Sequence, residues 1–511
     1  MKKYQIGVDI GGTNTDVVLL DEKKNVLASC KKITSCPLEK SVIEAILELL
    51  HSQEVLPTAI EAIFLGTTHA TNAILEAKEL LKVGLIRIAG HRPDSSPAFF
   101  WPAELRCSVL QSYECIDGGF ECHGAPITPF DKDQAREAIR KLFAHNVQSI
   151  AVVGCYSSVN NAEELEVKEL IKEMLGTDFP VALSSEIGGI GFLERENATL
   201  LNASLKKVIS DGFSQMQQAL GRCGMNAPLF MVQNDGSIMS LQQAIEMPIL
   251  TIAAGQTNSF IGGCKVAGVS RACVVDIGGT STDIGVVTNA LPKRSCQATK
   301  IGGVELQFAI PDVLSLALGG GSIIAHGAIG PQSVARMLLE KAQCFGGNTL
   351  TFTDVGVVLG VLDLPGANPT LVDLTKERAK ELLLLAKDML LYGIQKVVGK
   401  EKDLPIVVVG GASALVKAAL PDLPLLIPQH AHVANAVGAA LAGISATTQI
   451  VAPLSQNREA LLEEIKAKTC QEAISRGANG ALTRVANVEI IPYAYSKEGL
   501  AKIRVTAIGP R

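Results

Sequence analysis

The segment Val8-Asp-Ile-Gly-Gly-Thr-Asn-Thr-Asp16 decides how this sequence folds, because it recurs almost unchanged as Val275-Asp-Ile-Gly-Gly-Thr-Ser-Thr-Asp283. Only Asn14 and Ser281 differ between the two copies. A repeat at this wide spacing is too long for a solenoid unit, so it predicts two large domains that each begin with the same segment. Apolar runs flank each copy, which predicts that each forms the turn of a β-hairpin.

The chemistry of the repeated segment suits a phosphate group. Paired glycines reach positive φ and let backbone N–H groups approach an anion without an intervening Cβ, and the threonines add hydroxyl donors. One copy alone could equally be a plain tight turn, but two unrelated hairpins would not need the same Thr and Asp at every step. We expect phosphate to be bound by Gly11, Gly12, Thr13 and Asn14 in the first copy and by Gly278, Gly279, Thr280 and Ser281 in the second.

The aspartate that opens each copy stands at the end of a predicted strand. A carboxylate in that place can hold Mg²⁺ or a metal-bound water, so Asp9 and Asp276 are the predicted metal ligands and catalytic carboxylates. For Asp16 and Asp283, at the far end of each copy, a catalytic role and simple pinning of the hairpin remain equally open.

Composition excludes several classes of protein. The chain has 511 residues and a net charge of −5, so more than one domain is expected and a nucleic-acid partner is not. The N-terminus resembles a first strand and not a signal peptide, and no apolar run is long enough to span a membrane. The cysteines form no CxxC pair, which predicts reduced thiols and a cytoplasmic protein.

Strand and helix patterns alternate along the chain, which indicates α/β layers. The long helical pattern over Arg195–Leu220 is expected to cross between domains, and Pro228–Gln233 to begin the strands of the second domain. The predicted division is residues 1–200, residues 201–450, and a C-terminal extension of a helix plus strands over residues 451–511.

A third glycine-rich element, Ile406-Val-Val-Val-Gly-Gly-Ala-Ser-Ala414, follows late in the second domain. Together with the two repeated segments it resembles the nucleotide motifs of the superfamily that contains actin, Hsp70 and the sugar kinases. The resemblance implies two duplicated actin-like (ribonuclease H-like) ATPase domains with a nucleotide cleft between them. It also implies Mg·ATP as cofactor, with Gly410, Gly411 and Ala412 against the adenosine.

Further segments resemble the ATP-binding A-type subunit of the hydantoinase/5-oxoprolinase family. They are Gly66–Ala73, Ser184–Ile187, Glu194–Thr199, Met231–Gly236, Leu318–Ile323 and Thr353–Asp354. The resemblance implies an ATP-dependent hydrolase of a small cyclic amide, such as a hydantoin or oxoproline-like lactam, that phosphorylates the carbonyl oxygen. A B-type partner subunit and a homo-oligomer are compatible with it. The chain departs from the family pattern at Ala253–Gly263 and Leu339–Gly346.

The Gly66–Ala73 segment supplies more candidates for the cleft. Thr67 and Thr68, with Asn72, are expected next to the γ-phosphate, and the alternative is that they cap the helix that starts near Ala70. His69 is an acid–base candidate, although a lone histidine is more often structural. The remaining candidates are Glu186, Glu194 and Arg195, which could reach the cleft, and His430 and His432, for which a loop role is favoured over metal binding.

Two other functions use the same scaffold and stay open as alternatives. One is a small-molecule kinase or an ATP-dependent carboxylase component, and the other is an Hsp70-like regulatory ATPase. A GxxxxGK[ST] phosphate loop and a GxSxG nucleophile elbow are both missing from the sequence, which excludes P-loop NTPases and α/β-hydrolases.

Overall fold

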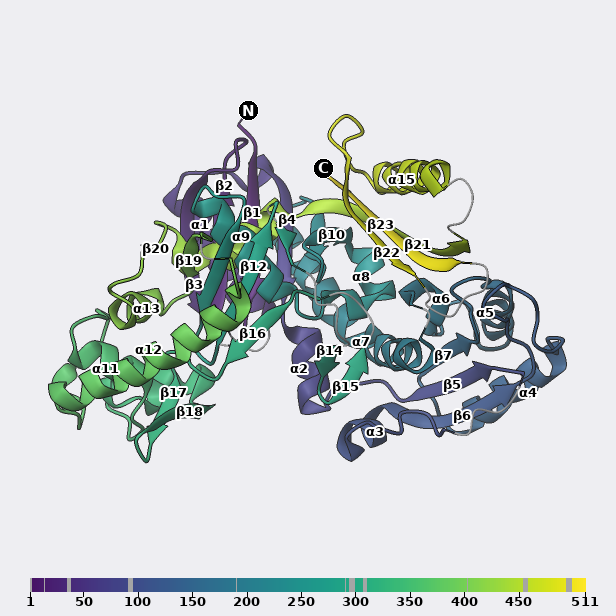
Figure 1. The fold of residues 1–511 in the computed structure, drawn as a ribbon, viewed down its shortest axis with the longest axis horizontal. Coiled ribbons are helices and arrows are strands. Elements are labelled where there is room, and N and C mark those ends of the chain that lie inside the picture. The colour runs from purple at the N-terminus through teal and green to yellow at the C-terminus, as the bar shows by residue number, and fades with distance from the viewer. Residues whose placement is uncertain are drawn as a thin grey trace.

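The computed structural model describes residues 2–12, 14–34, 38–90, 95–189, 191–289, 291–293, 299–306, 310–401, 403–453, 458–492 and 499–511. Its architecture is mixed α/β, with two large sheets that each begin with one copy of the repeated segment (Figure 1). In order across the sheet, the nine strands of the first are β22 (Arg484–Pro492), β23 (Leu500–Gly509), β21 (Gly443–Pro453), β10 (Ser237–Ser240), β9 (Leu229–Val232), β4 (Ile60–Thr67), β1 (Tyr4–Ile10), β2 (Asn14–Leu20) and β3 (Val26–Ile33).

The second sheet repeats the start of the first. Its strands are β13 (Leu291–Pro292), β12 (Thr282–Thr288), β11 (Ala272–Ile277), β19 (Ile406–Val409) and β20 (Leu425–Leu426), with β16 (Val313–Leu316) also paired to β12. In both sheets the repeated segment joins two antiparallel strands, and the first of these pairs in parallel with a later strand. Asp9 lies opposite Asp16, and Asp276 lies opposite Asp283. The predicted hairpins and the internal duplication are therefore confirmed.

A parallel four-stranded sheet is inserted into the first half of the chain. Its order is β6 (Leu110–Ile116), β5 (Val83–Ile88), β7 (Ser149–Gly154) and β8 (Val181–Leu183). Helices α4 (Lys132–Ala144) and α5 (Ala162–Leu175) share one apolar core with this sheet, and α7 (Phe192–Arg222) packs against it from the first sheet's side. In Figure 1 this layer lies on the opposite side of the molecule from α11, α12 and α13.

The remaining elements connect or cover the sheets. The helices are α1 (Leu38–Ser52), α2 (His69–Glu76), α3 (Ala103–Val109), α6 (Ser184–Ile187), α8 (Leu241–Glu246), α9 (Ala254–Val266), α10 (Leu338–Lys341), α11 (Phe352–Val358), α12 (Lys376–Val398), α13 (Ser413–Ala419), α14 (Ala434–Leu441) and α15 (Arg458–Ser475). Two small hairpins are β14 (Thr299–Ile301) with β15 (Val304–Leu306), and β17 (Ser322–Ala325) with β18 (Ala328–Ser333).

Helices α9 and α14 connect the two halves by crossing between them. Helix α9 follows the strands of the first sheet but packs on β11, β12 and β19, whereas α14 follows the second sheet and packs on β1 and β4. The helices meet at glycines: a Cβ on Gly262 would lie 1.8 Å from the Ala434 carbonyl oxygen, and one on Gly438 would lie 1.9 Å from the Asn258 carbonyl oxygen. Only glycine permits such close approach of two backbones, so this reciprocal contact fixes how the halves face each other.

Two expectations about the crossing were wrong. The 195–220 helix does not cross between the halves, because the apolar residues of α7 belong to the same core as those of β1 and β4. The strand expected over Pro228–Gln233 is present as β9, but it pairs in parallel with β4 and so belongs to the first sheet. The crossing comes later, at α9.

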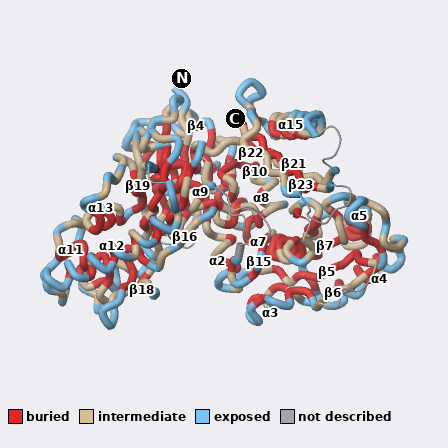
Figure 2. Tube along the Cα trace, viewed as in Figure 1, coloured by how far each residue is buried: buried red, intermediate tan, exposed pale blue. Residues whose placement is uncertain are grey.

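The C-terminal extension also joins the first sheet. The helix and two strands expected after residue 450 are present as α15, β22 and β23, and β21 links them to β10. The division of the chain at residues 200 and 450 stays a prediction. Buried segments are concentrated in the sheets and the helices against them (Figure 2). Among the described residues, no helix is both long and apolar enough to cross a membrane.

Candidate active site

The two repeated segments form matching turns. In the first, the Gly11 N–H donates to the Asn14 carbonyl at 2.9 Å, and in the second the Gly278 N–H donates to the Ser281 carbonyl at 2.9 Å. Gly12, Gly279 and Thr280 are exposed at the tips. Thr13 lies outside the described residues. Each turn therefore presents backbone to solvent, as an anion site requires.

Asp9 and Asp276 bring these turns into one site. Burial raises the pKa of Asp9 to about 7, with a further increase from Asp16 and Asp276 and an opposing effect of the Asn435 hydrogen bond. Burial likewise raises the pKa of Asp276 to about 6, against a lowering by the Ser259 hydroxyl. Asn435 of α14 donates to Asp9, and Ser259 of α9 lies near Asp276, so the close crossing of α9 and α14 brings the two segments near each other.

The crossing helices bring equivalent positions close to the two aspartates, and one of these positions makes a hydrogen bond. Asn435 follows Ala434 on α14 and donates from Nδ2 to Asp9 Oδ2 at 3.1 Å. Ser259 follows Asn258 on α9 and acts on Asp276. Because Ala434 and Asn258 are the residues that meet the two crossing glycines, the same geometry is repeated about the crossing. Sequence reasoning missed both residues, for which the only signal was a helical spacing to a following glycine.

Lys31 on β3 is a third residue that sequence reasoning missed. Its ammonium lies 2.8 Å from Asp16 Oδ1 and also lowers the pKa of Asp9 and Asp276. Lys31 therefore offsets part of the negative charge that the duplicated aspartates gather in the cleft. A lysine among ordinary β-strand residues carries no motif, so its position could not be recognised in advance.

The strand that pairs in parallel with the first strand of each hairpin has a glycine at or directly after its end, beside the first aspartate. A Cβ on Gly66 would lie 2.9 Å from Asp9 Oδ1, and one on Gly410 would lie 2.5 Å from Asp276 Oδ1. The Gly410–Ala412 segment thus lies directly against the second turn, and the Ala412 N–H donates to the Ile277 carbonyl at 3.3 Å. Beyond it, the space next to Gly411 is open, and contact with adenosine remains a prediction.

The glycine-rich segment over residues 319–321 packs on the second turn. Gly320 and Gly321 donate from their N–H groups to the carbonyls of Gly278 and Gly279, at 3.0 and 2.7 Å. Thr353 in turn donates from N–H and hydroxyl to the Gly320 carbonyl, at 2.7 and 2.8 Å. These contacts fix the carbonyl groups of the turn and leave its exposed tip free to present N–H groups.

The two threonines after β4 have different surroundings. Thr67 is buried, and its hydroxyl accepts from the His69 N–H at 3.1 Å, which is the capping role weighed as the alternative. Thr68 donates from N–H to the Ile10 carbonyl at 3.2 Å, and Asn72 Nδ2 donates to its hydroxyl at 3.4 Å. Thr68 and Asn72 thus lie beside the first turn, whereas a catalytic role for either threonine stays a prediction.

A cavity of about 610 Å³ opens next to Thr68. Its walls come from α2, from the start of α9, from the β14–β15 hairpin and from β16, and in Figure 1 α2 lies beside that hairpin. Asp283, Gln256 and Ser315 form its polar end. Gln256 Nε2 donates to Asp283 Oδ2 at 3.1 Å, and the Ser315 hydroxyl donates to Asp283 Oδ1.

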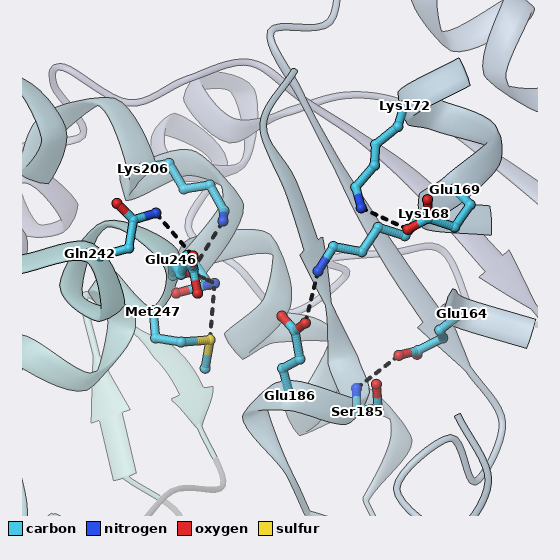
Figure 3. Close-up of polar contacts among 11 residues, drawn as sticks. Glu164, Lys168, Glu169, Lys172, Ser185, Glu186, Lys206, Gln242, Glu246 and Met247 are labelled. Carbon is cyan, nitrogen blue, oxygen red and sulfur yellow. Dashed lines mark hydrogen bonds and ion pairs between the residues drawn. The ribbon is translucent and has the colours of Figure 1, made fainter. Parts of the chain in front are cut away.

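Three predicted polar residues lie away from the cleft. Glu186 pairs with Lys168 at 3.0 Å and lines a different cavity, between the inserted sheet and α7 (Figure 3). Arg195 is buried, and it donates to Ser184 Oγ and to the Gly189 carbonyl. The expectation that these two reach the cleft was wrong, because Glu186 pairs α6 with α5 and Arg195 joins α7 to Ser184 and Gly189. Glu194 begins the same helix.

The histidines have no shared role in the site. His69 Nε2 lies 3.8 Å from a Glu79 carboxylate oxygen, on an exposed side of α2. His432 lies near Asp16 and Lys31, and burial followed by Lys31 lowers its pKa. Within the described parts of the chain, no group of three or more His, Cys, Asp or Glu side chains could hold a metal ion.

The chain matches two family models that together cover most of its length. Residues 5–175 match the hydantoinase/oxoprolinase N-terminal region, and residues 195–448 match hydantoinase/oxoprolinase. The first supports the interpretation of residues 66–73, and the second covers the second turn and the 406–414 element.

Curated relatives are distant and longer. The chain is 27% identical to the caprolactamase subunit alpha of Pseudomonas jessenii, over 71% of this chain and 55% of the relative. It is 25% identical to the acetophenone carboxylase gamma subunit of Aromatoleum aromaticum, over 70% of this chain and 53% of the relative. The chain thus spans about half the length of the curated relatives it matches.

Two solved structures share the fold. An ATP-dependent caprolactamase from Pseudomonas jessenii superposes with a TM-score of 0.78 at 20% identity, over 99% of this chain and 87% of the other. Nucleotide-free acetone carboxylase superposes with a TM-score of 0.73 at 17% identity, over 100% of this chain and 88% of the other. At these identities the likeness concerns the fold alone.

Proposed function

Because this chain belongs to the hydantoinase/oxoprolinase family, we propose that it is the ATP-binding component of an enzyme that opens a cyclic amide. The observation that carries the proposal is that equivalent positions on the closely crossing helices α14 and α9 lie beside Asp9 and Asp276, each at the root of a glycine turn. In this proposal the N–H groups of residues 11–14 and 278–281 hold the phosphates, and Gly410–Ala412 lies against the adenosine.

The residues present fit Mg²⁺ held together with a nucleotide. Mg²⁺ is usually bound by one or two carboxylates plus substrate phosphates and water, and not by an all-protein cage. Asp9 Oδ1 is buried and has no hydrogen-bond partner among the described residues. An unpaired buried carboxylate oxygen is costly, and a metal or its bound water would satisfy it. Asp9 and Asp276 are therefore the proposed ligands.

When bound, Mg·ATP supplies a phosphoryl group that can activate an amide carbonyl, whose resonance otherwise resists attack by water. The protein's own contribution is to position groups and balance charge. Asn435 orients Asp9, Ser259 lies near Asp276 and lowers its pKa, and Lys31 offsets the charge of both aspartates. Thr68 and Asn72 are proposed to place the acceptor beside the first turn.

A carboxylase component is the second candidate function, because two of the similar proteins are named as carboxylases of ketones. Relatives named as subunits also support a partner chain for this protein. The two functions differ in the acceptor: a lactam in one case and a ketone in the other. Stimulation of ATP turnover by a lactam but not by a ketone would favour the first, and the reverse result would favour the carboxylase.

Calorimetric titration with a non-hydrolysable ATP analogue tests the central claim. With Mg²⁺ present we expect binding in the micromolar range, and no detectable binding at millimolar analogue would refute the proposal. Hydrogen exchange adds a second readout. Because both turns contact one nucleotide only when the cleft is closed, protection should appear together at residues 11–14 and 278–281.

A further inference from the structure

Asp16 and Asp283 occupy the same position in the two hairpins, opposite Asp9 and Asp276, but their surroundings differ. Asp16 is 5% exposed and is held by the Lys31 ammonium. Asp283 is half-buried, is held by the neutral side chains of Gln256 and Ser315, and lines the 610 Å³ cavity. The duplication has thus left one carboxylate closed off in an ion pair and the other facing a space beside the cleft.

That space has a polar end and an apolar body. The polar end is next to the nucleotide turns, since Thr68 there hydrogen-bonds the Ile10 carbonyl. The body is lined by Leu75, Ile252, Ile301, Ile310, Pro311 and Val313. A volume of about 610 Å³ holds a ring of six or seven atoms with room for substituents or water.

The charges on the walls disfavour an anionic ligand. The cavity carries the carboxylates of Asp283 and Asp312 and the ammonium of Lys300. Lys300 is already paired with Glu305 at 2.8 Å, and Asp312 with Lys293 at 3.9 Å, so both contribute little free charge. A substrate that bears its own carboxylate would face Asp283, which is held by neutral side chains, whereas an uncharged ring meets only apolar contacts and hydrogen-bonding groups.

We propose, on the basis of the proposed function, that this cavity is the acceptor site and that Asp283 recognises the N–H of an uncharged lactam. The Asp283 carboxylate accepts the amide hydrogen while the ring methylenes pack against the apolar wall. The carbonyl then faces Thr68 and the nucleotide turns. A ketone or an N-substituted lactam has no N–H to donate and loses this contact. Asp283 is in this account a specificity-determining residue for cyclic amides.

The test measures binding of ε-caprolactam by calorimetry or ligand-observed NMR, with the chain saturated by a non-hydrolysable Mg·ATP analogue. N-methylcaprolactam, cyclohexanone and 5-oxoproline serve as comparison probes. We expect the wild type to bind ε-caprolactam about tenfold more tightly than each of these, which is the scale of one hydrogen bond in a closed site.

Three variants test the contact and the cavity around it. Asp283→Asn should weaken ε-caprolactam about tenfold and leave N-methylcaprolactam unchanged. Asp312→Asn removes a charge from the same cavity but not the proposed acceptor, so it should shift neither probe more than about twofold. Thr71→Phe, which narrows the cavity from α2, should abolish binding of all the cyclic probes.

The outcomes separate this inference from the proposed function. If the ATP analogue fails to bind, the proposed function falls. If the analogue binds but ε-caprolactam does not, or if Asp283→Asn weakens both lactams equally, only the acceptor site is overturned. Preference for 5-oxoproline over ε-caprolactam would overturn the uncharged substrate class in the same way.

Discussion

The two halves of the chain carry the same hairpin and differ in what surrounds it. Both turns keep the first aspartate against a glycine and beside a crossing helix: Asp9 is buried and accepts from Asn435, and Asp276 is half-buried near Ser259. At the second aspartate they diverge: Asp16 is sealed in an ion pair with Lys31, and Asp283 borders a cavity. In the proposed function, a nucleotide held from both sides would keep Asp9 and Asp276 in like surroundings, whereas an acceptor that enters from one side would need only Asp283.

The largest effect is expected on ATP turnover, at Asp9 and Asp276, which occupy the same position in the two halves. Asp9→Asn and Asp276→Asn should each lower Mg²⁺-dependent ATP turnover by about 10²- to 10³-fold, the scale of losing one group that stabilises developing charge. Steady-state phosphate release measures this, with thermal melting as the control for folding. A variant that keeps full turnover would show that its half of the duplication is a relic.

The crossing of α9 and α14 predicts a large effect on stability. Gly438→Ala would place a Cβ 1.9 Å from the Asn258 carbonyl oxygen, so the helices must separate at a cost of about 3 kcal/mol. Gly212→Ala on α7 is the matched control, because its Cβ would meet nothing within 4 Å. That control should gain about 0.5–1 kcal/mol from helix propensity. Equal effects in denaturant unfolding would contradict the close crossing.

The third prediction follows from the difference between Asp16, which is paired with a cation, and Asp283, which is held by neutral side chains. Lys31→Met leaves Asp16 buried without its cation, and should destabilise the fold by about 2 kcal/mol. Ser315→Ala removes a neutral partner from the half-buried Asp283 and should cost less than about 1 kcal/mol. Urea titration of both variants measures the difference. If Ser315→Ala proves the costlier change, Asp283 is the structural member of the pair.

The sequence predicted those parts of the site that a contiguous motif encodes. Both turns, the hairpins around them and the 406–414 element follow from glycine spacing and apolar flanks, which are local properties. Asn435, Ser259 and Lys31 lie on other elements, far from the aspartates in sequence. They become visible only once the chain is folded, because nothing in a helix or strand pattern distinguishes them from surface polar residues.

The same limit accounts for the errors in the fold. The apolar pattern of α7 shows that the helix is buried but not against which sheet, and β9 has the same composition whether it pairs with β4 or with β11. The crossing at α9 depends on small residues that allow close backbone approach, and a glycine in a helix can equally mark a kink or a helix end. Glu186 belongs to the Ser184–Ile187 segment, which resembles the family. It nevertheless pairs with Lys168 and lines the cavity beside α7, and not the cleft.

The smallest expected effect is a difference between Asp9 and Asp276 in how each makes the stability of the fold depend on pH. The folded pKa is about 7 for Asp9 and about 6 for Asp276, against 3.8 in an unfolded chain. Each carboxyl therefore holds its proton in the folded state after the unfolded chain has lost it. Between pH 4 and the folded pKa the native state binds more protons, so these groups reduce stability as the pH rises and have a constant effect above that pKa.

Replacing either residue with asparagine removes its share of this dependence. The stability gained by Asp9→Asn over the wild type should grow from pH 4 to about pH 7, and the gain from Asp276→Asn should level off near pH 6. We expect gains of about 1–2 kcal/mol at pH 8 in the absence of Mg·ATP, measured by denaturant unfolding across this range. Identical pH profiles would mean that the two carboxylates titrate as one coupled pair. A saturating Mg·ATP analogue should reverse the order, because a ligand that binds the folded wild type more tightly stabilises it more. If Asp9→Asn remains the more stable protein with the analogue bound, Asp9 is not a metal ligand and the first half does not take part in binding the metal.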